Sequence, residues 1–329
     1  MGVSGVRCIK IRKKTTTIPN MPEPRPKTDE TEKSQTKTTI NDPSHLARCA
    51  QLAMVLEVAA SPKPGNVDRD HDYPDTTFEH FLASAIGTYP VLETAAAAGS
   101  EAGSRSEGSV GALIHAAARE SLQWQRGGNT HFGAFVLLIP LLIAEGSSRP
   151  VSEIVETTTA DDAVEFYRAF AIADVRTDSV PDFDLEESDS IVRIRGEEIR
   201  LIDLMRLSAD RDLIANEWAT GFLRTMRCAD LIAKRAEGMT INDAIVCTFM
   251  QILAETPDTF IRTKFGREKA IEVSRGAYEI VSGSSDLESI ISGVHEFDER
   301  LIREKVNPGS TADIIIGGLF LALVRGLVV

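Results

Sequence analysis

Apolar residues recur at helical spacing along most of the chain from residue 45 onward. They stand three and four positions apart, which is the period of one helix face, so each such run predicts a helix. The predicted helices cover 45–59, 77–99 with a kink at Pro90, 110–123, 132–145, 152–173, 201–238 as one or two helices, 241–255, 266–282, 285–305 and 311–327.

One stretch breaks the helical pattern. Residues 178–189 are acidic and loop-like, and 191–195 then alternate apolar and polar positions ahead of a turn at 196–197. Alternation of that kind predicts a short β-hairpin. With this exception the pattern predicts an all-α fold, a single multi-helix bundle-like domain over 41–329, and we expect its polar loops to converge on one cleft.

Residues 1–40 differ from the rest of the chain. They are basic and rich in Thr and Pro, and they show no sustained apolar periodicity. A segment of this composition buries too little apolar surface to fold, so we expect a disordered basic tail. Its start lacks the apolar core of a secretory signal.

Charge and cysteine usage restrict the partners. The chain has 36 basic and 49 acidic residues, a net charge of −13, which argues against general nucleic-acid or acidic-membrane surfaces. The apolar runs 132–144 and 314–324 are shorter than the roughly 20 residues that cross a bilayer. Cys49, Cys228 and Cys247 show no CxxC spacing and predict buried free thiols of a cytoplasmic protein. The oligomeric state stays open, a homo-oligomer included.

The first polar stretch, residues 60–72, lies between two apolar runs. Its prolines and a glycine stiffen the backbone, so Lys63, Asn66 and Asp68 are expected in a fixed geometry. Asp68 stands among alternating acids with His71, and carboxylates are the ligands that a hard cation prefers. A cation beside a rigid lysine suits a polyphosphate, although a solvated turn between helices explains the same residues.

The second polar stretch, residues 126–133, opens directly into an apolar helix. Free backbone N–H groups at a helix start favour an anion. Asn129 and Thr130 are expected either to cap the helix or to hydrogen-bond a ligand. His131 is either a first-turn residue of ordinary structure or a residue whose titration is used.

The third polar stretch, residues 256–259, precedes Arg262 and Lys264. Asp258 is expected to cap the following helix, and Thr259 belongs to the same turn. Arg262 and Lys264 are the next source of positive charge for a phosphate.

The fourth polar stretch, residues 307–313, leads into the last apolar helix. We expect Ser310 and Thr311 to cap that helix. Asp313 falls in its first turn, where a buried acid needs a metal or a basic partner. The common nucleotide, zinc and acyl-transfer motifs are absent from the sequence, so any phosphate site here is unconventional.

Taken together, residues 61–68 (SPKPGNVD), 128–133 (GNTHFG), 257–259 (PDT) and 307–313 (NPGSTAD) resemble the triphosphoribosyl-dephospho-CoA synthase family. The resemblance spans about residues 42–329 and is strongest to an archaeal-type branch. Two features depart from the bacterial pattern. Residues 69–75 (RDHDYPD) replace a segment of the form NxGxHxDMD, and Phe132 stands where those members carry lysine.

The resemblance implies an enzyme that joins ATP to 3′-dephospho-CoA, or to a related acceptor hydroxyl, and releases adenine. It implies Lys63, with Arg262 or Lys264, on the triphosphate, and Asp68 and Asp313 on Mg²⁺ or on the cationic reaction centre. It implies that Asn129, Thr130 and His131 bind the ribose or the phosphates. Further contacts with the nucleotide are expected from Asn66, Asp258, Thr259, Ser310 and Thr311. The base is His131 or an aspartate.

Two other functions fit the residues. A Mg²⁺-dependent hydrolase of N-glycosidic or phosphate bonds in a nucleotide would use the same acids. A non-enzymatic helical nucleotide-binding protein would need none of them for catalysis.

Overall fold

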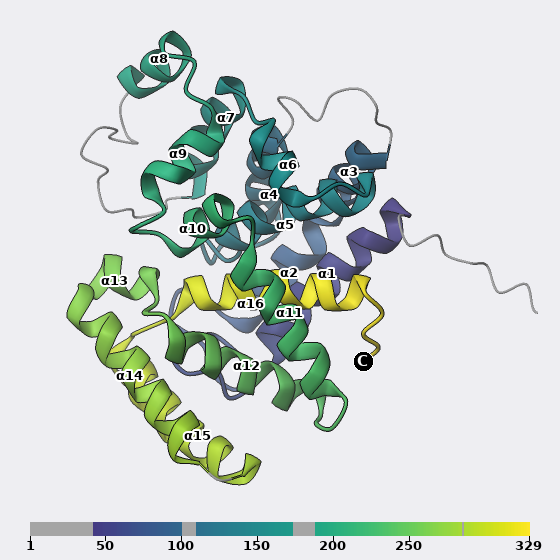
Figure 1. Ribbon diagram of the computed structural model, residues 1–329. Helices are drawn as coiled ribbons and strands as arrows, with labels where there is room; N and C mark the ends of the chain where they lie inside the picture. The colour runs from purple at the N-terminus through teal and green to yellow at the C-terminus, as the bar shows by residue number, and fades with distance from the viewer. Residues whose placement is uncertain (1–41, 101–109, 174–187, 285) are drawn as a thin grey trace, which may run out of the picture. The chain divides into compact units, whose positions relative to one another are not determined.

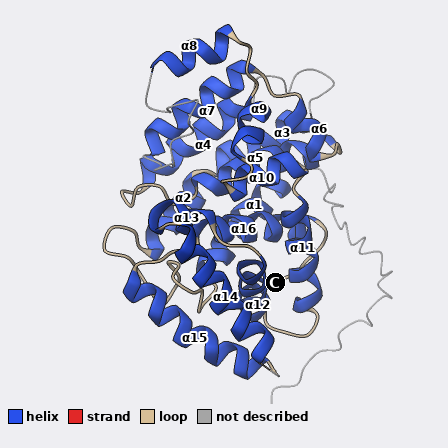
Figure 2. Ribbon diagram, turned by 60° about the vertical axis from the view of Figure 1, so that its left-hand side comes forward, coloured by secondary structure: helices blue, strands red, loops and turns tan. Residues whose placement is uncertain are grey.

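The computed structural model describes residues 42–100, 110–173, 188–284 and 286–329, whose course Figure 1 shows. Every regular element in these ranges is a helix, drawn blue in Figure 2, and no strand occurs within them. The predicted all-α fold is confirmed. The predicted tail at 1–40 and most of the acidic stretch 178–189 lie outside the described residues.

Sixteen helices make up the described chain. The first eight are α1 Pro43–Ala59, α2 Phe78–Gly87, α3 Tyr89–Ser100, α4 Val110–Trp124, α5 Phe132–Ser147, α6 Val151–Glu156, α7 Ala160–Ala173 and α8 Ser188–Gly196. The others are α9 Leu201–Ser208, α10 Leu213–Thr220, α11 Leu223–Ala236, α12 Ile241–Glu255, α13 Thr259–Phe265, α14 Arg267–Gly283, α15 Leu287–Glu304 and α16 Gly309–Val324.

Local capping explains where several predicted helices begin. Asp42 accepts the backbone N–H of His45 at 3.2 Å, and Pro43 occupies the first helical position, where no N–H is needed. Thr240 accepts the N–H of Asp243 at 3.2 Å at the start of α12. Both caps lie within a few residues of the predicted starts.

The predicted hairpin is wrong, because 191–195 belong to helix α8. Ile191 and Ile194 stand three positions apart and pack against the core, whereas Val192 is 71% exposed. The Arg193 side chain reaches Glu197 at 3.0 Å, an i,i+4 pair of the helical kind. The alternating residues therefore belong to an amphipathic helix that buries only a narrow apolar face.

Each of three long predicted helices is broken into shorter ones. Within 77–99, α2 ends at Gly87 and α3 begins at Tyr89, so Pro90 lies in the first turn of a new helix instead of kinking one. Within 152–173, the carboxylate of Asp162 accepts the N–H of Thr159 at 2.8 Å and restarts the chain as α7. Within 201–238 three helices form, because Asp212 caps α10 and Gly221 ends it in the left-handed region at φ 73°.

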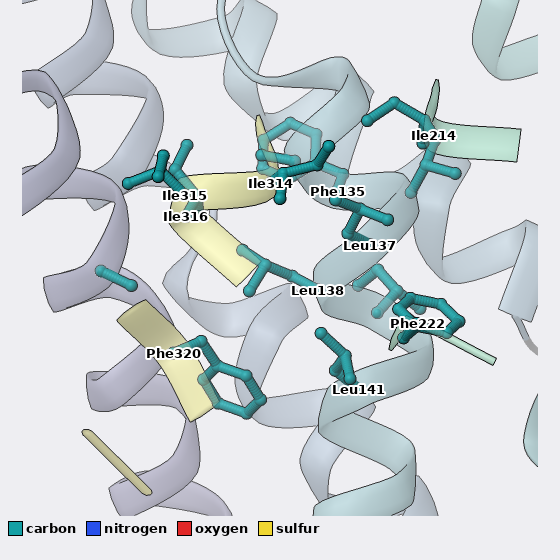
Figure 3. Close-up of a cluster of buried hydrophobic side chains, with 14 of the residues drawn as sticks. Phe135, Leu137, Leu138, Leu141, Ile214, Phe222, Ile314, Ile315, Ile316 and Phe320 are labelled. Atoms are coloured by element: carbon teal, nitrogen blue, oxygen red, sulfur yellow. The ribbon is translucent and has the colours of Figure 1, made fainter. Parts of the chain in front are cut away.

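The core centres on α5 and α16, whose residues are apolar around most of the helix circumference and hence mostly buried. Figure 3 shows side chains of α16 beside side chains of α5, including Ile314, Phe320, Phe135, Leu138 and Leu141. Each fully buried side chain of this size contributes about 1.5–3 kcal/mol of hydrophobic free energy.

A proline inside α5 leaves one carbonyl of that helix without its usual partner. Pro140 has no N–H to donate to the carbonyl of Val136. The indole N–H of Trp218, from α10, donates to that carbonyl at 3.1 Å. This bond ties α10 to the central helix.

Helix α16, yellow in Figure 1, packs against α1, α5, α11 and α12, and its first turn meets α13. Several elements therefore pack around α16 along its length. Cys49, Cys228 and Cys247 are buried free thiols, as predicted. Across the described ranges, no helix has both the length and the apolar character to cross a membrane.

Candidate active site

Asp68 organises the first polar loop. Its buried carboxylate accepts three backbone N–H groups, from Lys63 at 3.1 Å, Asp70 at 2.8 Å and His71 at 3.0 Å. Short acids that bond to the backbone on both sides fix a turn. The stiffness expected of this loop therefore comes from Asp68 as well as from its prolines.

Gly65 seats the same loop on the chain that leads into α16. A Cβ at this position would lie 2.0 Å from the carbonyl oxygen of Val306, and φ is +73°, so only glycine fits. The Gly65 N–H donates to Asp298 Oδ1 at 2.9 Å, and the Tyr73 hydroxyl donates to the Gly65 carbonyl at 2.7 Å. The first stretch is thereby fixed against Asp298 of α15 and against Val306, the residue just before the fourth stretch.

Lys63 is fully buried and ion-paired. Its Nζ lies 2.6 Å from Glu57 Oε1 of α1, with exposed fractions of 1% and 2% for the two side chains. Burial raises the pKa of Glu57; the charge of Lys63 opposes that shift, and the charge of Asp68 adds to it. The ammonium predicted to face a triphosphate thus has a carboxylate partner within the protein.

His131 of the second stretch is buried beside this pair. Its Nδ1 is 2.8 Å from Ser84 Oγ, and the Phe81 ring meets it edge-on with centroids 5.0 Å apart. Burial, and after it the charge of Lys63, lower the pKa of His131 to about 3, so the ring is neutral near pH 7. Its Nε2 is buried and has no hydrogen-bond partner in the described chain.

The other two residues of the second stretch serve local structure. Asn129 Oδ1 accepts the N–H of Phe132, the first residue of α5, at 3.0 Å, although the N-cap position itself is His131, whose side chain forms no capping bond. Thr130 Oγ1 lies 3.4 Å from Ser121 Oγ on α4. Both side chains therefore position the loop that carries His131.

Asp258 joins the third stretch to the fourth. Its Oδ1 accepts the N–H groups of Phe260 at 2.9 Å and Ile261 at 3.1 Å, so it caps α13 as predicted. Its Oδ2 accepts both the N–H and the hydroxyl of Thr311 at 2.7 Å. Burial raises the pKa of Asp258 to about 6.

The predicted capping of the last helix by its own side chains is wrong. Ser310 and Thr311 lie inside α16, and no side chain of its N-cap residue forms a capping bond. Asp258 supplies the acceptor from another element instead. Ser310 Oγ lies 3.1 Å from Thr259 Oγ1, a second link between the two stretches.

Asp313 faces the second stretch from the first turn of α16. A Cβ on Gly133 would lie 2.0 Å from Asp313 Oδ2, so the carboxylate occupies the space that this glycine leaves open. Burial raises the pKa of Asp313 well above its ordinary value of 3.8; the charges of Glu57, Asp258 and Asp212 raise it further. The side chain nevertheless keeps some exposure.

Four polar stretches that are distant in sequence therefore meet around the start of α16. Gly65 contacts the backbone at Val306, Gly133 contacts Asp313, and Asp258 bonds to Thr311. These contacts bring the polar loops together, while the single cleft predicted for them stays a prediction. What they build is a buried group of acids with one lysine and one neutral imidazole.

A second acid group lies at the edge of the first loop. Ligand atoms of Asp68, His71 and Asp298 all fall within 4.8 Å of one another, and in the described ranges this is the one such trio of acid, His or Cys side chains. His71 Nδ1 and Asp298 Oδ2 lie 3.0 Å apart, but they lack the alignment of a hydrogen bond. Burial raises the pKa of Asp298 to about 6.

The two basic residues after the third stretch lie apart from Lys63. Arg262 lines a cavity of about 380 Å³ between α10, α13 and α14. Lys264 is exposed, with Nζ 5.4 Å from the centroid of the Phe265 ring. The third stretch brings Asp258 and Thr259 to the buried group, but it carries Lys264 to the surface.

Residues 43–328 match the family model of ATP:dephospho-CoA triphosphoribosyl transferase. The chain belongs to this family.

Relatives of this transferase agree with the match. A probable 2-(5''-triphosphoribosyl)-3'-dephosphocoenzyme-A synthase of Pseudomonas putida is 26% identical over 301 residues, which cover 86% of this chain and 96% of the relative. The protein of that name in Pseudomonas aeruginosa is 26% identical over 287 residues, 84% of this chain and 89% of the relative.

A solved structure shares the fold of this transferase. The crystal structure of a putative triphosphoribosyl-dephospho-coA synthase from Archaeoglobus fulgidus superposes with a TM-score of 0.58 at 26% identity. The superposition covers 74% of this chain and 99% of the other.

Sequence reasoning missed Glu57 and Asp298 in this transferase. Asp298 interrupts the buried face of α15, where Val294, Phe297 and Leu301 recur at helical spacing. Glu57 likewise falls on the buried face of α1. A charged residue at an apolar-face position is the signal that would have found both.

Proposed function

We propose that this member of the family transfers the triphosphoribosyl group of ATP to a hydroxyl of 3′-dephospho-CoA, or of a closely related acceptor, and releases adenine. The observation that carries the proposal is the meeting of Lys63, His131 and Asp313 around the start of α16. We further propose a cytoplasmic location, since buried free thiols are typical of a reducing compartment.

The reaction breaks the bond between ribose C1′ of ATP and the adenine nitrogen, and it forms a bond from C1′ to the acceptor oxygen. The acceptor hydroxyl gives up its proton, and the departing adenine takes up a proton, so no net proton is released. Glycosyl transfer of this kind passes through a carbon with oxocarbenium character. Nearby carboxylates stabilise such a positive centre.

We assign proton transfer to Asp313. Burial raises the pKa of this carboxyl group, and carboxyl groups with a raised pKa are common among general acids and bases. The side chain retains some exposure and is held against Gly133 at the start of α5. His131, with a pKa lowered to about 3, is a poor proton acceptor at neutral pH.

Two buried polar atoms are suited to hydrogen bonds with substrate. Asn66 Nδ2 and His131 Nε2 lie in buried side chains and have no hydrogen-bond partner in the described chain. Unpaired buried polar atoms are rare, and a bound ligand is one way to satisfy them. We assign these atoms to the ribose or the phosphates of ATP.

The Mg²⁺ that a triphosphate calls for fits the trio of Asp68, His71 and Asp298. The trio offers two carboxylates and an imidazole, with Asp298 held by the Gly65 N–H and Asp68 held by three backbone N–H groups. Such support orients ligands before a metal arrives. A divalent cation there would offset the charge of the phosphates, and the imidazole makes Mn²⁺ a suitable substitute. Asp313 lies outside this trio.

Metal binding can be measured without turnover. We expect Mn²⁺ titrated into the protein to bind once, as followed by electron paramagnetic resonance of the free ion. Asp298→Asn should weaken this binding about 10- to 100-fold, whereas Glu296→Gln, an exposed acid on the same helix, should leave it unchanged. Equal binding by both variants would rule out the trio as the site.

The activity test is direct. The purified protein is incubated with ATP, Mg²⁺ and 3′-dephospho-CoA, and chromatography follows adenine and the coupled product. The proposal expects adenine to appear only when the acceptor is present. Adenine released without acceptor would indicate a hydrolase of the N-glycosidic bond. ADP or AMP without adenine would indicate hydrolysis or transfer of phosphate groups. No product at all would indicate a nucleotide-binding protein without enzymatic activity.

A further inference from the structure

The cavity that contains Arg262 has walls of two kinds. Leu213 of α10, Pro257 before α13 and Ile271 of α14 contribute apolar surface. The basic residues Arg262 and Arg267 line it as well. A volume of about 380 Å³ lies within the usual range of small-molecule sites.

The guanidinium groups in the wall differ in their partners. Arg224 forms an ion pair with the buried Glu217 at 2.7 Å and is neutralised by it. Among the described residues, Arg262 donates only to the carbonyl oxygen of Asp210, at 3.3 Å, and Arg267 forms no ion pair. Two arginines without a carboxylate partner in the described ranges therefore line one cavity of a chain whose net charge is −13.

Two carboxyl groups also line the cavity, and they limit how much negative charge it accepts. Asp212 caps α10 by accepting the N–H of Ala215 at 2.8 Å. Asp210 is exposed. With the charges of Arg262 and Arg267 set against these acids, the wall suits a ligand of modest charge with an apolar part better than a free triphosphate.

The cavity adjoins the reaction centre. Thr259 in its wall lies 3.1 Å, Oγ1 to Oγ, from Ser310, which is in the first turn of α16. Asp212 in its wall is close enough to Asp313 for its charge to raise the pKa of that carboxyl group. The trio Asp68, His71 and Asp298 shares no residue with the cavity.

We propose that this cavity binds the pyrophosphate-bearing part of the acceptor, with Arg262 and Arg267 on the two phosphates. A pyrophosphate diester carries two negative charges, fewer than a free triphosphate, and each guanidinium group can pair with one of its phosphates although Asp210 and Asp212 line the same wall. The triphosphate of ATP is then left to the cation site on the other elements. This inference rests on the proposed function, and it moves Arg262 from the triphosphate to the acceptor.

Calorimetry separates the two substrates without requiring turnover. We titrate 3′-dephospho-CoA and ATP with Mg²⁺, each alone, into the wild-type protein and into Arg262→Ala and Arg267→Ala. Each variant should bind 3′-dephospho-CoA about tenfold or more weakly and ATP within about twofold of wild type. Arg275→Ala is the matched control, an exposed arginine of α14 outside the cavity, and should change neither affinity.

The outcomes divide cleanly. Weaker ATP binding in place of weaker acceptor binding overturns the proposal, and so does unchanged acceptor binding in both variants or an absence of acceptor binding by wild type. Acceptor binding that depends on both arginines, without adenine release by wild type, would refute the transfer reaction and keep the cavity as a pyrophosphate site. Circular dichroism of each variant confirms that it is folded.

Discussion

Replacing Lys63 by methionine tests whether its ammonium serves the protein or the substrate. The Lys63 Nζ lies 2.6 Å from Glu57 Oε1, and both side chains are at most 2% exposed. Removing one partner of such a pair leaves a buried charge uncompensated, which costs about 3–5 kcal/mol of unfolding free energy. We therefore expect Lys63→Met to lose about that much stability in urea unfolding followed by far-UV circular dichroism.

The loss should depend on pH in a defined direction. Burial raises the folded-state pKa of Glu57 above its ordinary value of 4.5, and removing Lys63 raises it further. An acid with a raised folded-state pKa binds more protons when folded, so stability falls as pH rises through that range. The defect of Lys63→Met should thus be small near pH 4.5 and grow toward neutrality.

A double-mutant cycle gives the sharper measurement. Adding Glu57→Leu to Lys63→Met removes the stranded charge, so the double variant should recover at least about 2 kcal/mol relative to the single one. Lys269→Met is the control, because Lys269 pairs with the half-exposed Glu272 and should cost less than about 1 kcal/mol. If Lys63→Met kept its stability and showed a raised KM for ATP, this reasoning would be refuted. That result would indicate that Lys63 binds the phosphates of ATP.

Two further substitutions probe the start of α16. Gly133→Ala gains about 1 kcal/mol of helix propensity but places a methyl group 2.0 Å from Asp313 Oδ2. We expect the unfolding free energy to change by less than about 2 kcal/mol and kcat to fall at least about tenfold. The control Gly196→Ala, which has open space around it, should leave kcat unchanged. Asp258→Asn removes two buried acceptor bonds to the first turn of α16 and should cost about 2–4 kcal/mol in urea unfolding, whereas Asp210→Asn should cost almost nothing. An unchanged kcat in Gly133→Ala would contradict the role given to Asp313. An unchanged unfolding midpoint in Asp258→Asn would contradict the role given to Asp258.

Much of the helical fold follows from local pattern. The apolar periodicity of α1 and α12, and the caps Asp42 and Thr240, depend on residues a few positions apart. The same is true of the polar stretches, whose glycines and short acids mark helix ends. Local signals were less reliable within long runs, where Asp162 and Asp212 restart helices that periodicity alone would join.

The site itself shows where local pattern stops. Sequence alone determined that these polar stretches lie at the ends of apolar helices and that Asp313 falls in a first turn. It also determined that the motifs resemble one family of transferases. Tertiary structure decided that Glu57 neutralises Lys63, that Asp258 caps a helix 53 positions away at Thr311, and that Asp298 joins Asp68 and His71. The physical reason is that a buried charge is stabilised by whichever partner packing brings within a few ångströms, and distance along the chain carries no information about that partner.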